Sequence, residues 1–147
     1  MNDYPDRPLI GVGVVVFKGD RVLLVRRGKP PRRGQWSLPG GRQRLGETVR
    51  AAAAREVAEE AGLTIEVTAL LDVVDSLTRD DRGAVQYHYT LIDLLAEWRS
   101  GEAQAGHDAA DVTWADPADL GPYALWSETE RIIALAMEKR SREADSL

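Results

Sequence analysis

Three glutamates on one short segment are the residues of this chain most able to do chemistry. Glu56, Glu59 and Glu60 lie in an alanine-rich stretch, and their i, i+3, i+4 spacing places them within an arc of about 100° on one helical face. Like charges this close destabilise a helix, so a bound cation that offsets the repulsion is favoured. Hard divalent ions such as Mg²⁺ take oxygen ligands, which three carboxylates on one face supply together.

A solvated acidic face is the ordinary alternative for glutamates at this spacing. The surrounding residues favour the cation site instead. Arg55 directly precedes the glutamates, and Gly40 and Gly41 stand at the start of the loop that leads into the helix.

The spacing around the glutamates resembles the Nudix box, over residues 41–63. Chance matching of so many positions is on the order of one in a hundred million. The preceding segment, GQWSLPGG, is also similar to the lead-in of that family. The fixed positions of the motif are filled by Gly41, Glu47, Arg55, Glu56, Glu59, Glu60 and Gly62, with apolar Val57 and Leu63 where the motif requires them.

The resemblance implies an α/β fold, an α/β/α sandwich with a mixed β-sheet, over a single domain at residues 1–147. It implies a pyrophosphohydrolase in which water attacks one phosphorus of a nucleoside diphosphate that is linked to another group. Mg²⁺ or Mn²⁺ would be held by Glu56, Glu59, Glu60 and the carbonyl of Gly40. Arg55 would orient the carboxylates, with Glu47 as its partner.

The catalytic base is open between the helix and a later loop. Glu59 is the first choice within the helix. Glu102, Asp108 and Asp111 lie in or beside an exposed loop at 99–110 and are the alternatives, as a base or as an extra ligand, although acidic loop residues are usually only solvated.

A basic run precedes the acidic helix. Between Lys18 and Arg55 the only acidic residues are Asp20 and Glu47. The run predicts a rim that faces phosphates, with Arg26 and Arg42 as phosphate-binding candidates. For any single arginine, a solvated loop is an equally good interpretation.

ADP-ribose is the favoured substrate, from the similarity of the segments after the box to ADP-ribose pyrophosphatase-like members. Nucleoside triphosphates, including oxidised ones, are the alternative. Arg79 stands where the ADP-ribose subgroup often has proline, and residues 64–77 lack the Pro/Trp array of NADH-cleaving members. A non-catalytic nucleotide-sensing module is an alternative of another class, disfavoured because every carboxylate of the box is present.

Composition narrows the remaining possibilities. The 147 residues carry a net charge of −5 and no cysteine, which excludes thiolate metal sites and disulfides and argues against sequence-independent nucleic-acid binding. No stretch is long and apolar enough for a membrane span, and the N-terminus does not resemble a signal peptide, which suits a cytoplasmic protein. The apolar residues of the C-terminal helix suit either the core or a homodimer interface.

Periodicity predicts the elements that must position these residues. An apolar run at 9–17 indicates a strand buried on both faces, and Gly62 is a C-cap for the box helix, which begins near Glu47 or Thr48. Ser127 and Glu130 form a capping box. Aromatic residues such as Trp36, Trp98 and Trp114 are more typical of core than of base stacking. Further strands are predicted at 21–27, 35–38, 64–73, 85–98 and 111–115. Irregular backbone is predicted at 39–46 and a last helix at 127–142. The face of the box helix predicted to pack on the sheet consists of Ala54, Val57, Ala58 and Ala61.

Overall fold

The computed structural model describes residues 3–30 and 32–145. The strands are β1 (Leu9–Lys18), β2 (Arg21–Arg27), β3 (Trp36–Ser37), β4 (Gly40–Arg42), β5 (Thr64–Arg79), β6 (Val85–Ser100) and β7 (Ala109–Ala115). The helices are α1 (Val49–Ala61), the short 3₁₀ helix η1 (Gly121–Tyr123) and α2 (Ser127–Asp145).

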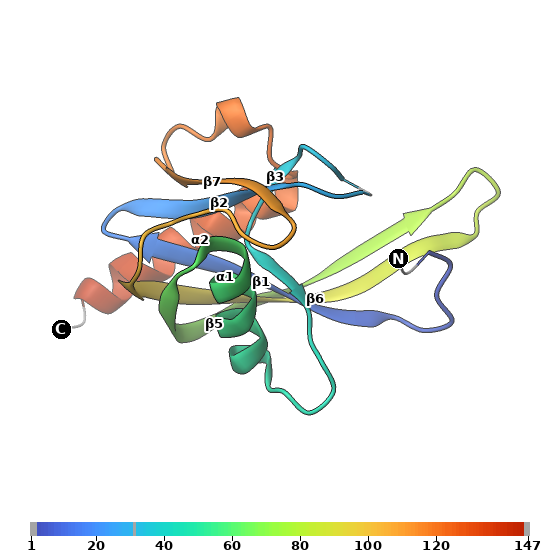
Figure 1. Cartoon of the computed structure of the whole chain (residues 1–147), viewed down its shortest axis with the longest axis horizontal. Coiled ribbons are helices and arrows are strands. Elements are labelled where there is room, and N and C mark those ends of the chain that lie inside the picture. Colours follow the sequence, from blue (N-terminus) through green and yellow to red (C-terminus); the bar gives the residue numbers. More distant parts are fainter. Residues whose placement is uncertain (1–2, 31, 146–147) are drawn as a thin grey trace.

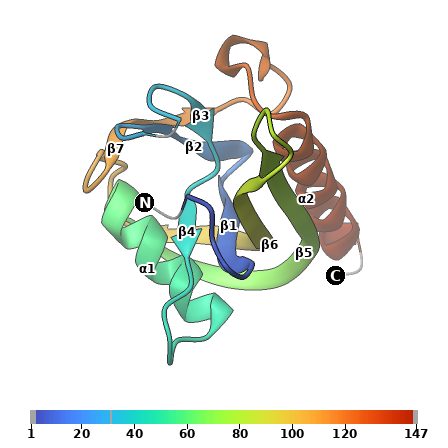
Figure 2. The same cartoon turned by 90° about the vertical axis from the view of Figure 1, so that its right-hand side faces the viewer.

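The strands pair in one mixed sheet. Its order is β3-β2-β1-β6-β5, with β4 added to β1 and β7 added to β2. β1 runs parallel to β6 and antiparallel to β2 and β4. Figure 2 shows α1 on one side of the sheet and α2 on the other. The predicted α/β fold with a mixed sheet between helices is confirmed.

The continuous apolar run of β1 is explained by burial on both faces. Val14 and Val16 pack in the core beneath α1, whereas Val15 and Phe17 pack in the core beneath α2. Successive side chains of a strand point to opposite faces, so a strand covered on both sides needs apolar residues throughout. The central strand thus joins the two cores.

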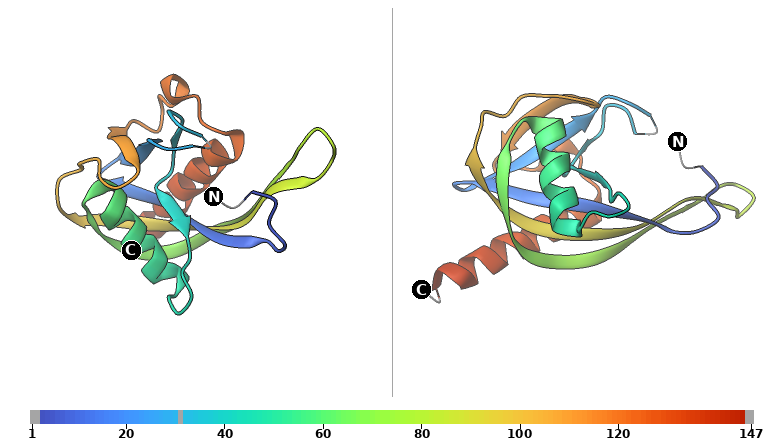
Figure 3. Two further views of the ribbon diagram at one scale, coloured as in Figure 1. Left: turned by 45° about the vertical axis from the view of Figure 1, so that its right-hand side comes forward. Right: turned by 60° about the horizontal axis from the view of Figure 1, so that its bottom comes forward.

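A long hairpin of β5 and β6 extends beyond the helical layers (Figure 1, Figure 3). The two strands pair from Thr64 with Ser100 to Arg79 with Val85. Asp80 closes the turn, because its Oδ1 accepts hydrogen bonds from the backbone amides of Arg82 and Ala84, both at 2.9 Å. The predicted hairpin and its turn are confirmed.

Some strand boundaries differ from the prediction. The backbone of Gly40–Arg42, predicted as irregular, forms β4 because it pairs with β1. A Cβ at Gly40 would lie 2.0 Å from the carbonyl oxygen of Val12, so only glycine allows this close pairing. The predicted loop at 99–110 is shortened at both ends, since β6 runs to Ser100 and β7 begins at Ala109.

Both helices also differ in detail. In α1, Ala58 was expected to pack on the sheet but is exposed, whereas Ala52 and Ala53 are fully buried. In α2, the amide of Glu130 donates to the carbonyl of Trp126 at 3.1 Å. Trp126 therefore stands at the N-cap position and Ser127 lies inside the helix, so the predicted capping box of Ser127 and Glu130 is wrong. No helix within residues 3–30 and 32–145 has the length and hydropathy to cross a membrane.

One buried acid lies on the α2 side of the sheet. Asp93 in β6 is 5% exposed, and Gly13, its neighbour on β1, leaves the space, since a Cβ there would lie 2.2 Å from Asp93 Oδ1. Burial raises the pKa of Asp93 to about 6; the negative charge of Asp72 adds to the effect, and Arg131 opposes it.

Asp93→Asn should stabilise the protein in a pH-dependent manner. The folded protein holds the Asp93 proton up to a pH of about 6, whereas the ordinary pKa is 3.8. Neutral Asp93 therefore makes its full contribution to the free energy of unfolding below pH 3.8, and this contribution is lost as the pH rises through 6. The substitution should raise the free energy of unfolding by up to about 3 kcal/mol at pH 7.5 and by little at pH 4.

Urea unfolding at both pH values measures this difference. Asp20→Asn, in the exposed turn between β1 and β2, is the matched control and should change neither value. An equal gain for Asp93→Asn at the two pH values would contradict the interpretation.

Candidate active site

Helix α1 presents the box carboxylates from a well-defined start to a well-defined end. The side chain of Thr48 accepts a hydrogen bond from the amide of Ala51 at 3.0 Å and caps the first turn. Gly62 ends the helix in the left-handed conformation, with φ 71°, and its amide donates to the carbonyl of Ala58. The predicted start near Thr48 and the cap at Gly62 are confirmed.

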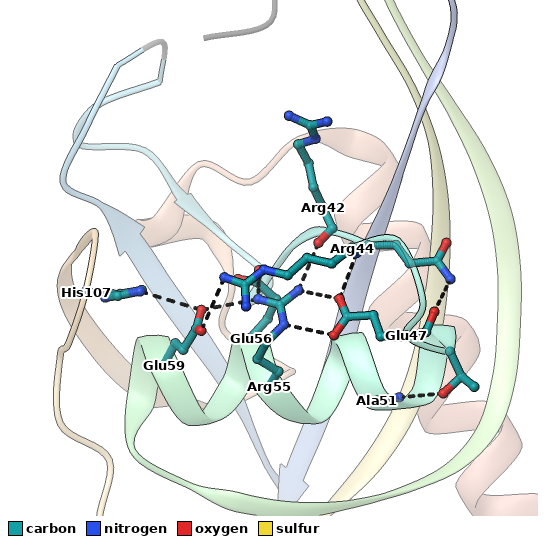
Figure 4. Close-up of polar contacts among 10 residues, drawn as sticks. Arg42, Arg44, Glu47, Ala51, Arg55, Glu56, Glu59 and His107 are labelled. Atoms are coloured by element: carbon teal, nitrogen blue, oxygen red, sulfur yellow. Dashed lines mark hydrogen bonds and ion pairs between the residues drawn. The ribbon is translucent and has the colours of Figure 1, made fainter.

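Arg55 lies at the centre of a polar network that joins this helix to the loop before it (Figure 4). Its Nε and Nη2 donate to the two carboxylate oxygens of Glu47, at 3.0 and 2.6 Å, as expected. Nη2 also donates to the carbonyl of Arg42, and Nη1 donates to Glu56 at 2.7 Å. The bond from Arg55, helped by the amide of Arg44, lowers the pKa of Glu47 to about 2. Arg55 therefore holds the loop while it orients Glu56.

Glu56 and Glu60 form a half-buried carboxylate pair beside the glycines. A Cβ at Gly41 would lie 2.6 Å from the carboxylate carbon of Glu56, so this glycine makes room for the acid. The amide of Gly40 faces Glu60 Oε2 at 3.4 Å. Burial raises the pKa of Glu60 well above its ordinary value, and Glu56 adds to the effect by hydrogen bonding and repulsion.

Glu59 is turned away from this pair. Its carboxylate lies 3.3 Å from Arg55 Nη1, 3.7 Å from Arg44 Nη2 and 3.7 Å from His107 Nε2. Figure 4 shows Arg44 and His107 approaching Glu59 from two sides. His107 escaped the sequence prediction, because its proximity to α1 arises only when the loop between β6 and β7 docks on the helix.

The donor set fits a divalent cation, although the ligands are not gathered at one point. Among the described residues, no three His, Cys, Asp or Glu side chains are close enough to form a ready-made metal site. Glu56 and Glu60 are nevertheless paired in a half-buried place where two negative charges are unfavourable without a cation. Glu59 would have to leave its cationic neighbours to join them.

The three loop acids expected as alternatives do not reach the box. Glu102 is exposed. Asp108 Oδ1 pairs with Lys29 Nζ at 2.7 Å, which lowers the pKa of Asp108. Asp111 Oδ1 accepts the amide of Val112 at 2.8 Å. In the described ranges, none of the three forms a hydrogen bond or ion pair with a glutamate of α1.

The two phosphate-binding candidates lie in different surroundings. The guanidinium of Arg42 points away from the carboxylates (Figure 4) and forms no hydrogen bond or ion pair with any described residue. The guanidinium carbon of Arg26 lies 5.7 Å from the ring centre of Trp36, a cation–π distance. Arg42 remains free to meet an anion, whereas the guanidinium of Arg26 already lies over the ring of Trp36.

An aromatic pocket lies beside Trp36 of β3. Its volume is about 600 Å³, and its lining includes Trp36, Tyr123 and Trp126. The rings of Trp36 and Tyr123 meet edge to face, with centres 5.3 Å apart. Trp36 and Tyr123 also pack against the core beneath α2. Trp98 and Trp114 pack against the core beneath α1, as predicted for most of the aromatic residues.

Comparisons with known proteins agree with this architecture. A putative 8-oxo-dGTP diphosphatase 2 from Mycobacterium tuberculosis is 38% identical over 126 residues, which cover 82% of this chain and 89% of that protein. An ADP-ribose pyrophosphatase from Methanocaldococcus jannaschii is 36% identical over 126 residues, 86% of this chain and 71% of that protein. The crystal structure of a MutT NUDIX hydrolase from Burkholderia pseudomallei matches with a TM-score of 0.76 and 31% identity over 88% of this chain and 98% of that one. Since the NUDIX domain model also matches residues 7–136, the chain belongs to the Nudix family of pyrophosphohydrolases.

Proposed function

We propose that this chain hydrolyses the diphosphate linkage of a nucleoside diphosphate derivative with Mg²⁺ or Mn²⁺, and that ADP-ribose is its favoured substrate. The observation that carries the proposal is the half-buried pair of Glu56 and Glu60, in which Arg55 holds Glu56. Two acids held together in a partly desolvated place repel each other, so their position beside two close-packed glycines favours a bound cation. The ADP-ribose pyrophosphatase among the relatives supports the substrate.

The residues divide the work as follows. Glu56, Glu60 and the carbonyl of Gly40 would hold the cation, and Glu59 would join them or act as the base. When bound, the cation would neutralise phosphate oxygens and lower the pKa of a water molecule. Arg55 keeps Glu56 in place through its bonds to Glu47.

Glu59 is the first choice for the base because it is the box carboxylate that is not part of the pair of Glu56 and Glu60. It takes a proton from the attacking water as the water oxygen bonds to phosphorus. The bond from that phosphorus to the bridging oxygen breaks, and ADP-ribose yields AMP and ribose 5-phosphate. Glu102, Asp108 and Asp111 would require the loop to move before any of them could serve.

The basic and aromatic residues bind the rest of the substrate. Arg42 contacts the phosphates, since its guanidinium has no hydrogen-bond or ion-pair partner among the described residues, and Arg26 does so from its place over the ring of Trp36. The nucleobase stacks in the pocket of Trp36 and Tyr123. The segment 36–40 links this pocket to Gly40 and spans at most about 14 Å, a distance that a nucleoside diphosphate can bridge.

A nucleoside triphosphate is the second candidate substrate, and oxidised nucleotides are included. The 8-oxo-dGTP diphosphatase among the relatives supports a triphosphate substrate, and its 38% identity to this chain is close to the 36% identity of the ADP-ribose pyrophosphatase. The aromatic pocket accepts a purine from either compound.

A substrate panel tests the proposal. Purified protein with Mg²⁺ is incubated with ADP-ribose, 8-oxo-dGTP, NADH and a dinucleoside polyphosphate, and the products are separated by chromatography. We expect AMP and ribose 5-phosphate, with kcat/KM for ADP-ribose at least about tenfold above the others, equivalent to about 1.4 kcal/mol. Tight binding without turnover across the panel would support the sensing module instead.

Glu56→Gln and Glu60→Gln should each lower kcat by roughly three orders of magnitude, because each removes a charged ligand of the proposed cation. The fold should persist, since Gln keeps the size of Glu. Glu60→Gln relieves the repulsion in the pair and should leave the Tm unchanged or higher, whereas Glu56→Gln also loses the ion pair with Arg55 at 2.7 Å and should not raise it. Glu138→Gln, on the exposed face of α2, is the matched control. Full activity in either box variant sinks the metal assignment.

Trp36→Ala should raise KM by about tenfold or more and change kcat little, because stacking on a base contributes about 1–3 kcal/mol. Trp36→Phe keeps an aromatic face and should retain most of the affinity. Steady-state kinetics on ADP-ribose measure both, with the Tm as a check on folding. An unchanged KM in a folded Trp36→Ala variant would remove the pocket from the binding site.

A further inference from the structure

The segment 101–108 between β6 and β7, here called the strap, is docked on the C-terminal end of α1. The amide of Gln104 donates to the carbonyl of Ala61 and the amide of Gly106 to the carbonyl of Glu60, both at 3.0 Å. The last carbonyls of a helix lack partners within the helix. The strap supplies two of these partners directly beside the box glutamates.

Two glycines allow this close docking. A Cβ at Gly106 would lie 2.8 Å from the carbonyl oxygen of Glu59, and one at Gly101 would lie 2.7 Å from that of Gly62. Contacts this short would push the strap away from the helix. The position of the strap is therefore sensitive to a single added methyl group.

The other end of the strap is attached to the segment after β2. The carbonyl of Asp108 accepts a hydrogen bond from the amide of Gly28 at 2.7 Å. The side chain of Asp108 pairs with Lys29 at the same distance. The strap is thus a bridge from α1 to the basic segment.

His107 lies between the two attachments. Its φ of 54° is in the left-handed region, which costs a non-glycine residue about 1 kcal/mol or more. The amide of Ala109 donates to the carbonyl of Gly106 at 3.1 Å and closes a turn with His107 at one of its two central positions, which accounts for this conformation. The ring of His107 is 62% exposed, and its Nε2 lies 3.7 Å from Glu59 Oε2. The turn and the two attachments of the strap hold His107 beside Glu59 (Figure 4).

We propose that His107 is a positioning residue for Glu59 and that the docked strap places it. Glu59 has a long side chain, and its bond to Arg55, at 3.3 Å, is the longest that Arg55 makes to a glutamate. Its further contacts are Arg44 and His107, each 3.7 Å away, and together they restrict the carboxylate to the site. His107 is the contact that the strap supplies. The proposal rests on the proposed function of Glu59 in hydrolysis.

Two variants that act at different points should have the same effect. His107→Ala removes the contact, and Gly106→Ala displaces the strap while it keeps the imidazole. Each should lower kcat by about 10- to 100-fold and leave KM within about twofold, because a small misplacement of a reacting group has an effect of this size. His107→Gln, which keeps a polar group at this position, should restore activity to within about threefold of the wild type.

The double variant Gly106→Ala/His107→Ala should be no worse than the more severe single variant, because both act through one contact. His88→Gln changes the only other histidine, and Gly121→Ala adds a methyl group where no atom lies within 4 Å. Both controls should match the wild type. The Tm of each variant separates displacement of the strap from unfolding.

A measurement without metal or substrate makes the test independent of turnover. The ring resonances of His107 in the NMR spectrum should shift in Glu59→Gln and remain in place in Glu138→Gln. Unchanged resonances in Glu59→Gln, or wild-type kcat in His107→Ala, would overturn the positioning role. If Glu56→Gln and Glu60→Gln are inactive while His107→Ala is fully active, only this proposal fails; if the two glutamate variants are active, the proposed function fails.

Discussion

The guanidinium of Arg55 binds groups from two parts of the chain at once, and the arrangement of the site depends on it. It holds both oxygens of Glu47 and the carbonyl of Arg42 on the loop side and Glu56 on the helix side. Bidentate binding fixes the orientation of a carboxylate as well as its distance. Without the positive charge of Arg55, Glu47 and Glu56 would repel one another.

Close approach of backbone to neighbouring atoms is the second constraint. Gly40 lies against β1, Gly41 against the carboxylate of Glu56, and Gly106 against the end of α1. Each glycine allows a different layer of the site to come into contact, so the loop, the helix and the strap converge on the same carboxylates. Gly40 is needed for the pairing of β4 with β1 as much as for its proposed role as a cation ligand.

The local elements were largely predictable from sequence, because their signals lie within a few residues of one another. The continuous apolar run of β1, the turn at Asp80 and the caps of α1 are examples. Predictions failed where a distant segment decides the outcome: Gly40–Arg42 becomes a strand only because β1 is available for pairing. Ala58 is exposed and Ala52 is buried because the sheet packs against a face that helical periodicity alone places imprecisely.

By itself, the sequence determined the family motif, the order of the elements and the presence of three carboxylates on one helix, since these depend on spacing along the chain. Only the tertiary structure decided how those carboxylates differ. Glu56 and Glu60 are paired in a half-buried place, whereas Glu59 faces Arg44 and His107. His107 comes from a loop more than forty residues away. Burial and charge at an atom depend on what packs around it, and that packing brings together segments whose distance in sequence carries no record of their contact.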